Sequence, residues 1–126
     1  MKYLILINSN PAVVDMFAGM TEDERRAQFQ IYWDVENDLE ESGELVDSTA
    51  IDEATQRAVR RGDDGVVVTD VPPPTTGSVV TGYYLVDVDD EARAVEIAAR
   101  FPEAVVDGGI RVARALTQED FDAIGM

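Results

Sequence analysis

The sequence contains no cysteine and no histidine, and Lys2 is its only lysine. The absence of cysteine excludes disulfides, thiol nucleophiles and thiolate metal sites. The absence of histidine excludes imidazole ligands and any Ser-His or Cys-His catalytic arrangement. Proton transfer would therefore depend on Asp, Glu, Tyr, Lys2 or water, and we expect no metal and no other cofactor.

Basic residues are scarce: 10 stand against 26 acidic ones, which gives a net charge of −16. This charge repels nucleic-acid phosphates and anionic lipid headgroups, so we expect neither as a partner. Two explanations of the acidity are open, adaptation to high internal salt and the codon bias of a GC-rich genome. The acids between residues 34 and 53 lack the oxygen spacing and turn glycine of a calcium loop and are interpreted as a solvated face.

Long apolar segments are also missing. None approaches the ~18 consecutive apolar residues of a membrane span, and MKYLILINSN lacks the length and cleavage pattern of a signal peptide. With 126 residues, 45% of them hydrophobic, the chain can build one core. We expect a single domain over residues 1–126, located in the cytoplasm.

The patterns that are present alternate between strands and helices. Thr21 and Glu24 form a capping-box motif at the start of a long helix, and Ser42-Gly43 supplies its stop. Strands are predicted over residues 3–7, 44–51, 82–88 and 109–116, helices over 11–18, 22–42, 91–101 and 117–124, and a hairpin over 56–61 and 65–70.

The long helix carries a core-facing stripe at three- and four-residue steps: Ala27, Ile31, Tyr32, Val35 and Leu39. Phe29 and Trp33 lie beside this stripe. They either pack under residues 10–20 or form a pocket wall or subunit contact. The helix predicted over residues 91–101 is expected to pack through Ala92, Val95, Ala98 and Ala99.

The predicted hairpin holds the densest basic cluster, formed by Arg57, Arg60 and Arg61. These arginines either bind an anionic group of a ligand or pair with neighbouring acids. Its second strand, with Val66, Val67 and Val68, is interpreted as buried.

That strand ends at Asp70, and Pro72, Pro73 and Pro74 follow in a stiff extended segment that must leave the sheet. Asp70 is therefore expected at a rigid strand end beside a loop, where ligand-binding groups are common. Its carboxylate could cap the turn, face a ligand, or do both, since it has several acceptor positions.

The chain resembles the small YCII-related proteins of the DGPF type. The resemblance rests on MKYLILI, LEESGELV, DDGVVVTDVPP and TGYYLVDVDDEARAVEIAARFP, which span nearly the whole sequence. It implies an α+β, ferredoxin-like antiparallel sheet with two main helices on one face, here with an inserted β-hairpin, and pairing into a dimeric α/β-barrel type of assembly.

Two departures from the family pattern bear on chemistry. Asp-Gly-Pro-Phe is replaced by Asp70-Val71-Pro72-Pro73, and the histidine often found midway along the long helix is replaced by Tyr32 or Trp33. Some relatives carry a His-Asp pair in a cleft, and one branch resembles muconolactone-type dehalogenases. Inherited His-Asp chemistry does not fit this sequence.

The favoured hypothesis is a small-molecule binding domain with a pocket around Asp70. Asp70 and Tyr32 would anchor the ligand, and the remaining pocket residues would be Phe29, Trp33, Pro72, Tyr83 and Arg60. A second hypothesis is a cofactor-independent acid/base enzyme, of lyase, isomerase or dehalogenase-like type, in which Asp70 abstracts a proton and Tyr32 donates one.

A third hypothesis is a dimeric regulatory interaction module. A sheet covered by helices on one side would expose Val67, Tyr84 or Val86 on the other, and a second copy would cover them. We therefore expect a homodimer.

Overall fold

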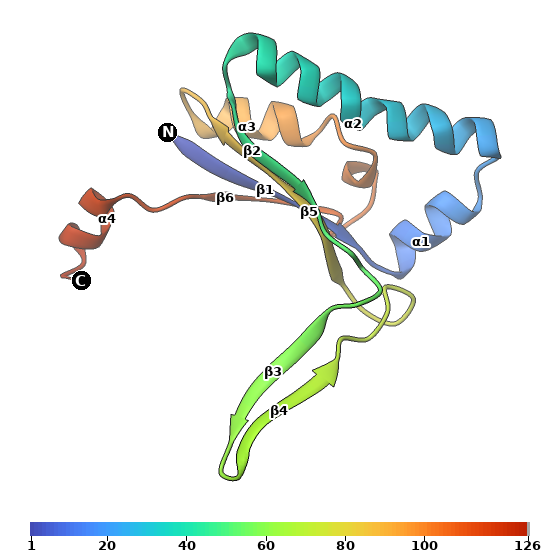
Figure 1. Cartoon of the computed structure of the whole chain (residues 1–126). Coiled ribbons are helices and arrows are strands. Elements are labelled where there is room, and N and C mark those ends of the chain that lie inside the picture. Colours follow the sequence, from blue (N-terminus) through green and yellow to red (C-terminus); the bar gives the residue numbers. More distant parts are fainter. Residues whose placement is uncertain (126) are drawn as a thin grey trace.

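The computed structural model describes residues 1–125 as an α+β fold in which helices pack on one face of a four-stranded antiparallel sheet (Figure 1). The sheet has the order β2-β5-β1-β6, and a separate two-stranded sheet, β3-β4, projects from it as a hairpin. The strands are β1 (Lys2–Ser9), β2 (Leu45–Ala50), β3 (Arg57–Gly62), β4 (Gly65–Asp70), β5 (Val79–Asp87) and β6 (Ile110–Arg114). The helices are α1 (Pro11–Ala18), α2 (Glu22–Ser42), α3 (Glu91–Ala98) and α4 (Gln118–Ala123), with a short 3₁₀ helix η1 (Pro102–Val105).

The sequence β1, α2, β2, β5, α3, β6 and the order of the strands are those of the β-α-β-β-α-β ferredoxin-like plan, which confirms the predicted fold class. The additions to this plan are α1, the hairpin and α4. None of the helices within residues 1–125 is long and apolar enough to cross a membrane.

The helix ends follow the capping residues of the sequence. Asn10 accepts a hydrogen bond from the Val13 amide to start α1, and Thr21 and Glu24 form the predicted capping box of α2. Gly43 ends α2 with a φ of 77°, a left-handed conformation that glycine adopts without a Cβ penalty.

The core lies between the sheet and the helices α2 and α3. Ile5 and Val86 from the sheet and Val35 and Leu39 from α2 are fully buried. The apolar face of α3 differs from the prediction: Ala94, Ile97 and Ala98 are buried, whereas Ala92, Val95 and Ala99 are exposed. Alanines on several sides of this helix left the position of the face ambiguous in the sequence.

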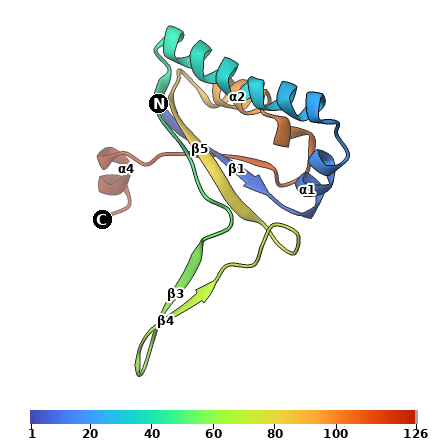
Figure 2. The same cartoon turned by 45° about the vertical axis from the view of Figure 1, so that its right-hand side comes forward.

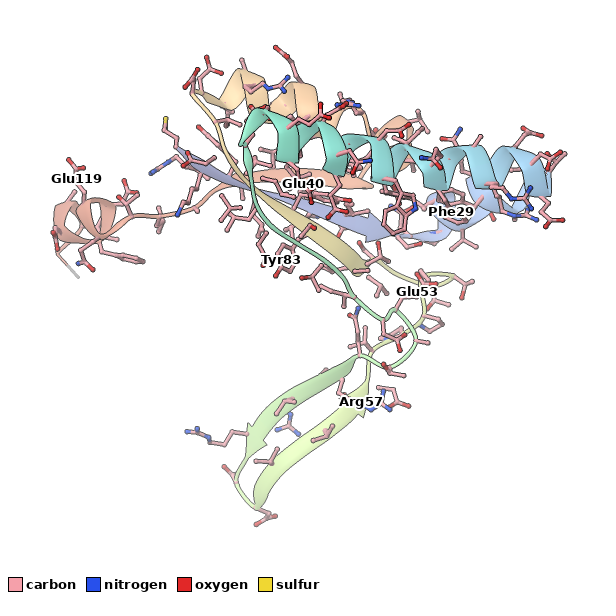
Figure 3. All side chains as sticks on the ribbon, turned by 45° about the horizontal axis from the view of Figure 1, so that its top comes forward. Phe29, Glu40, Glu53, Arg57, Tyr83 and Glu119 are labelled. Atoms are coloured by element: carbon pink, nitrogen blue, oxygen red, sulfur yellow. The ribbon has the colours of Figure 1, made fainter. Side chains whose placement is uncertain are left out.

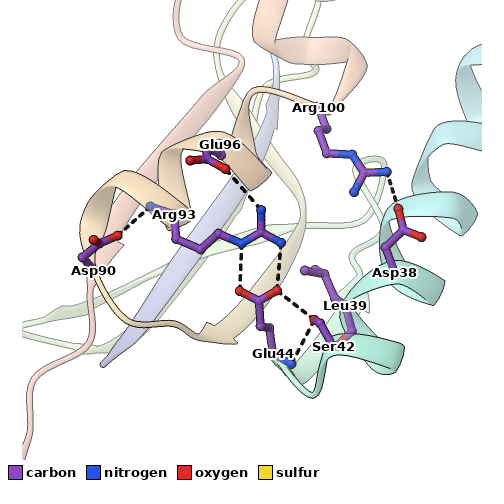
Figure 4. A network of polar contacts seen from close by, with 8 residues as sticks. All are labelled: Asp38, Leu39, Ser42, Glu44, Asp90, Arg93, Glu96 and Arg100. Carbon is purple, nitrogen blue, oxygen red and sulfur yellow. Dashed lines mark hydrogen bonds and ion pairs between the residues drawn. The ribbon is translucent and has the colours of Figure 1, made fainter.

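An arginine-carboxylate network joins the end of α2 to α3 (Figure 4). The guanidinium of Arg93 donates two hydrogen bonds, of 2.9 and 2.8 Å, to the two oxygens of Glu44. This contact is the largest cause that lowers the pKa of Glu44 to about 2. Arg100 pairs with Asp38 at 2.7 Å nearby, so both helices are held together at their polar edge.

The hairpin corrects the prediction for residues 66–68. Every residue of β4 is exposed, because β3 and β4 pair only with each other and leave the helix-covered sheet (Figure 2). Val59, Val66 and Val68 are 69%, 68% and 56% exposed. Their alternation and register place all three on one face of the hairpin.

The sheet face without helices also differs in its residues from the prediction. Tyr84 and Val86 are buried against the helices. Because side chains alternate along β5, Tyr83 and Leu85 lie on the open face instead, with Leu4 and Leu6 of the paired strand β1. All four are half-buried. The open face is apolar at its centre, as expected, but Tyr83 and Leu85 supply its β5 side chains in place of the predicted Tyr84 and Val86.

We predict that Arg93→Lys destabilises the fold by ~1 kcal/mol at pH 7, because lysine cannot make the two-pronged contact with Glu44. Since the folded pKa of Glu44 is lowered, this contribution is present above the ordinary value of 4.5 and is lost as the pH falls through about 2. Urea unfolding at several pH values measures it.

Arg26→Lys is the matched control. Arg26 pairs with Glu22 and Asp23 on the surface of α2 and is 71% exposed, so its replacement should change the free energy of unfolding by no more than ~0.5 kcal/mol. Equal effects of the two variants would contradict the assigned role of Arg93.

Candidate functional site

A cleft of about 720 Å³ lies on the helix-covered side of the sheet. Its roof comes from Phe29, Tyr32, Trp33 and Glu36 of α2, and its far end from α1. Its floor comes from the facing positions of β1, β2 and β5, among which small residues are frequent. The cleft is lined by Ile7, Ser9, Val13, Val14, Phe17, Phe29, Tyr32, Trp33, Glu36, Ser48, Thr49, Ala50, Glu53, Thr81, Gly82, Tyr84 and Glu103.

The floor is open because Gly82 has no side chain. A Cβ at this position would lie 3.1 Å from the carbonyl oxygen of Thr49 on the neighbouring strand, tighter than ordinary van der Waals contact. Ser9, Ser48 and Ala50 are the other small residues on this side of the sheet. The sheet therefore leaves space under α2 where larger side chains would fill it.

A row of stacked aromatic rings forms the apolar wall. Phe17 of α1 stacks on Phe29 at 5.8 Å between ring centroids, Phe29 on Tyr32 at 6.4 Å, and Tyr32 on the core residue Phe101 at 5.9 Å. Trp33 is 62% exposed and lines the same cleft. Both interpretations of the Phe29 and Trp33 ledge thus hold in part, because Phe29 packs on the segment 10–20 and both residues form the cleft wall.

Glu103 is the buried polar group of the cleft. It is only 5% exposed, and the Tyr32 hydroxyl donates a short hydrogen bond to its Oε2. Its other oxygen, Oε1, is buried without a hydrogen-bond partner in residues 1–125. Burial raises the pKa of Glu103, and burial together with the contact to Glu103 raises the pKa of Tyr32.

The position of Glu103 is imposed by its neighbours in the chain. Phe101 is 1% exposed and anchors the start of η1 in the core, and Pro102 fixes the first residue of the turn. Gly109 packs so closely that a Cβ there would lie 2.1 Å from the Glu103 carbonyl oxygen. A side chain at residue 109 would have to displace Glu103.

Two further acids line the cleft. Ser48 of β2 donates a hydrogen bond to Glu36 of α2, and Glu53 follows β2 near the Phe29 end of α2 (Figure 3). Tyr84 lies within the electrostatic influence of Glu36 and Glu103. Burial, and secondarily these two carboxylates, raise the pKa of Tyr84 to about 12.

The structure divides the predicted site residues into two groups. Tyr32, Phe29 and Trp33 line the cleft, as the pocket hypothesis required. Asp70 does not: it is 85% exposed in the hairpin and pairs with Arg57 across the strands at 3.3 Å. The structure does not bring Asp70 and Tyr32 into one cleft, because β4 leaves the main sheet.

The other predicted residues also lie outside the cleft. Arg60 and Pro72 are exposed on or beside the hairpin. Tyr83 lies on the open face of the sheet, where its hydroxyl donates to Asp47 at 2.7 Å. Their predicted roles as pocket residues for the same ligand are therefore not supported by the placement.

Sequence reasoning missed Glu103, Glu36 and Tyr84. Glu103 has a recognisable signal, because it is a lone acid within the apolar segment FPEAVV and ionisable residues are rarely buried without a role. Glu36 has none, since it is one of many acids on α2. Within residues 1–125 there is no group of three or more Asp or Glu side chains that could hold a metal ion.

The family model of the YCII-related domain matches residues 1–117 of the chain. The match includes every element that lines the cleft and ends at the residue that caps α4. No curated protein matches the chain.

We predict that Glu103→Gln becomes progressively favourable to stability as the pH rises. Below the ordinary value of 4.5, folded and unfolded carboxyls are both protonated; as the pH rises through the raised folded pKa, the buried carboxylate costs stability that glutamine does not. The melting temperature of the variant minus that of the parent should increase between pH 4.5 and 8. Glu119→Gln on exposed α4 should show no such trend, and a flat difference for Glu103→Gln would contradict its burial as a carboxylate.

Proposed function

The chain belongs to the YCII-related domain family, and from this premise we propose that it binds a small organic molecule in the cleft under α2. The observation that carries the proposal is the buried Glu103 Oε1 at the wall of a 720 Å³ cleft, which has no hydrogen-bond partner in the described part of the chain, residues 1–125. An unsatisfied buried polar atom costs ~1–3 kcal/mol. A ligand that donates a hydrogen bond to it would recover this cost.

The size and composition of the cleft support the proposal. Its volume is within the range of roughly 300–1,000 Å³ of small-molecule sites. Such sites combine apolar and aromatic walls with a few polar groups that fix the orientation of the ligand. Here Phe29 and Trp33 are the walls, and Tyr32, Glu103 and Ser48 are the orienting groups.

A second candidate, cofactor-independent acid/base catalysis, is favoured by the contact of Tyr32 with Glu103. Glu103 takes the role of the carboxyl that the sequence had suggested for Asp70, because an acid or base must lie within hydrogen-bonding reach of its partner. Burial raises the pKa of Glu103 above the ordinary value of a glutamate, which is the direction of shift expected for a general acid or base. Asp70, paired with Arg57 on the hairpin, has no such contact with Tyr32.

We also propose that the protein is a homodimer. The open sheet face offers Leu4, Leu6 and Leu85, and the hairpin offers an apolar face with two arginines, Arg57 and Arg61, on the same side. Arg57 pairs with Asp70 within the hairpin, which leaves Arg61 on this face to pair with a carboxylate of the second copy. The pairing would remove apolar surface of both elements from water.

We predict that a metabolite screen by thermal shift will identify a ligand, since binding to the folded form raises the melting temperature. Tyr32→Phe and Glu103→Gln should each raise the dissociation constant of that ligand at least tenfold, a loss of ~1.4 kcal/mol of binding free energy. The two effects should be non-additive, because the two side chains share a hydrogen bond. Asp70→Asn should leave binding unchanged; a tenfold loss in this variant would instead support the strand-end site.

Incubation of the identified ligand with the protein in D₂O separates binding from acid/base catalysis. Deuterium incorporation that disappears in Glu103→Gln, with binding only reduced, supports catalysis. A ligand that binds but incorporates no deuterium supports a binding function without catalysis.

For the dimer, we predict a sedimentation mass of twice 13.8 kDa at micromolar concentration. Leu85→Arg, on the open sheet face, should give monomer. Val95→Arg is the matched control because Val95 is 51% exposed on α3, away from that face, and this variant should remain dimeric. A monomeric parent, or equal dissociation by both variants, would overturn the dimer.

A further inference from the structure

We infer, on the basis of the proposed ligand-binding function, that the cleft selects an organic cation, an amine or ammonium group attached to an apolar, flat body. The lining of the cleft contains the carboxylates of Glu36, Glu53 and Glu103 and, among the described residues 1–125, neither lysine nor arginine. A ligand with a carboxylate or phosphate would place like charges together in a partly dehydrated site, which is unfavourable.

Some acids near the cleft pair with arginine, whereas the acids that line the cleft do not, among residues 1–125. Outside the cleft, Asp38 pairs with Arg100 and Glu44 with Arg93, both at less than 3 Å. Within residues 1–125, none of the three cleft glutamates forms an ion pair: Glu36 accepts from Ser48 and Glu103 from Tyr32, both neutral donors. No arginine or lysine of residues 1–125 therefore compensates the negative charge of the cleft.

The aromatic wall provides the second half of the recognition. The faces of aromatic rings attract cations, and the attraction is strongest for tryptophan. Trp33 is 62% exposed at the cleft, and Phe29 and Phe17 extend the aromatic wall. Aromatic faces combined with carboxylates form the kind of site that binds alkylammonium groups.

The buried end of the cleft fits the same ligand. An ammonium group donates hydrogen bonds and accepts none, so it matches Glu103 Oε1, the buried oxygen without a donor. Glu36, Tyr84 and Glu103 line the same cleft, and both carboxylates contribute to the raised pKa of Tyr84. A positive group in the cleft would be attracted by both carboxylates.

Three probes that carry a phenyl ring on the same two-carbon chain test the inference: 2-phenylethylamine (cation), 2-phenylethanol (neutral) and 3-phenylpropanoate (anion). Trp33 is the only tryptophan, so its fluorescence reports occupancy of the cleft directly. We expect the amine to bind at least tenfold more tightly than the alcohol, and the propanoate not to bind. Titration in both 0.05 and 0.5 M NaCl separates local recognition from attraction by the net charge, since the high salt screens charges beyond ~4 Å.

Matched variants complete the experiment. Glu103→Gln and Glu36→Gln should each raise the dissociation constant of the amine at least fivefold. The dissociation constant of 2-phenylethanol should change by less than twofold. Glu119→Gln removes the same charge from α4, at the opposite end of the molecule from Phe29 (Figure 3), and should change neither. If Glu119→Gln weakens the amine as much as Glu103→Gln does, binding reflects net charge only and the inference is overturned.

The remaining outcomes distinguish this inference from the proposed function. If the Trp33 fluorescence shows that the alcohol or the propanoate binds as tightly as the amine, the cleft binds small molecules but does not select cations. In that case only the inference fails. If the three probes are silent while the metabolite screen yields a neutral or anionic ligand that depends on Tyr32, the inference again fails alone. If no compound binds in either experiment, both fail.

Discussion

The arrangement of the site depends on how α2 packs against the sheet. Val35 and Leu39, in the C-terminal half of the helix, are fully buried and contribute roughly 1.5–3 kcal/mol each to stability. They meet bulky residues of the sheet, such as Ile5 and Val86. At the other half of α2 the sheet offers small residues, such as Ser48 and Gly82, so the helix spans an open floor.

Sequence patterns predicted what is local and missed what depends on distant partners. Capping residues such as Thr21 and Gly43 act within one turn, so the bounds of α2 could be predicted to the residue. Three consecutive valines at 66–68 indicate a strand, yet they do not distinguish a strand covered on both faces from one exposed on both. Tyr32, Phe29 and Trp33 were predicted because they share one helix, whereas Glu103, 71 positions from Tyr32, comes to the cleft only through the tertiary fold.

The separation of Asp70 from Tyr32 was not predicted from the sequence for the same reason. Its features are local: a strand end, then prolines that leave the sheet. These were interpreted correctly, but which sheet the strand belongs to is not a local property. Glu103 shows the reverse case: its only sequence signal is that it is a lone acid in an apolar segment, and its position is fixed by contacts with Gly109 and Tyr32. The site is therefore built from α2, which periodicity reveals, and from η1, which it does not.

The hairpin has a consequence for how this domain can change during evolution. The Ile51 amide, just after β2, bonds to the Thr81 carbonyl in β5 at 2.9 Å, so the chain leaves the sheet and returns to it at adjacent points. Residues 52–78 are thus an excursion between strands that are already paired. Lengthening such an excursion costs little, since doubling a loop adds only about 0.6 kcal/mol of closure entropy. Most of this segment is therefore free to be shortened, extended or exchanged for another module while the register of the sheet is preserved.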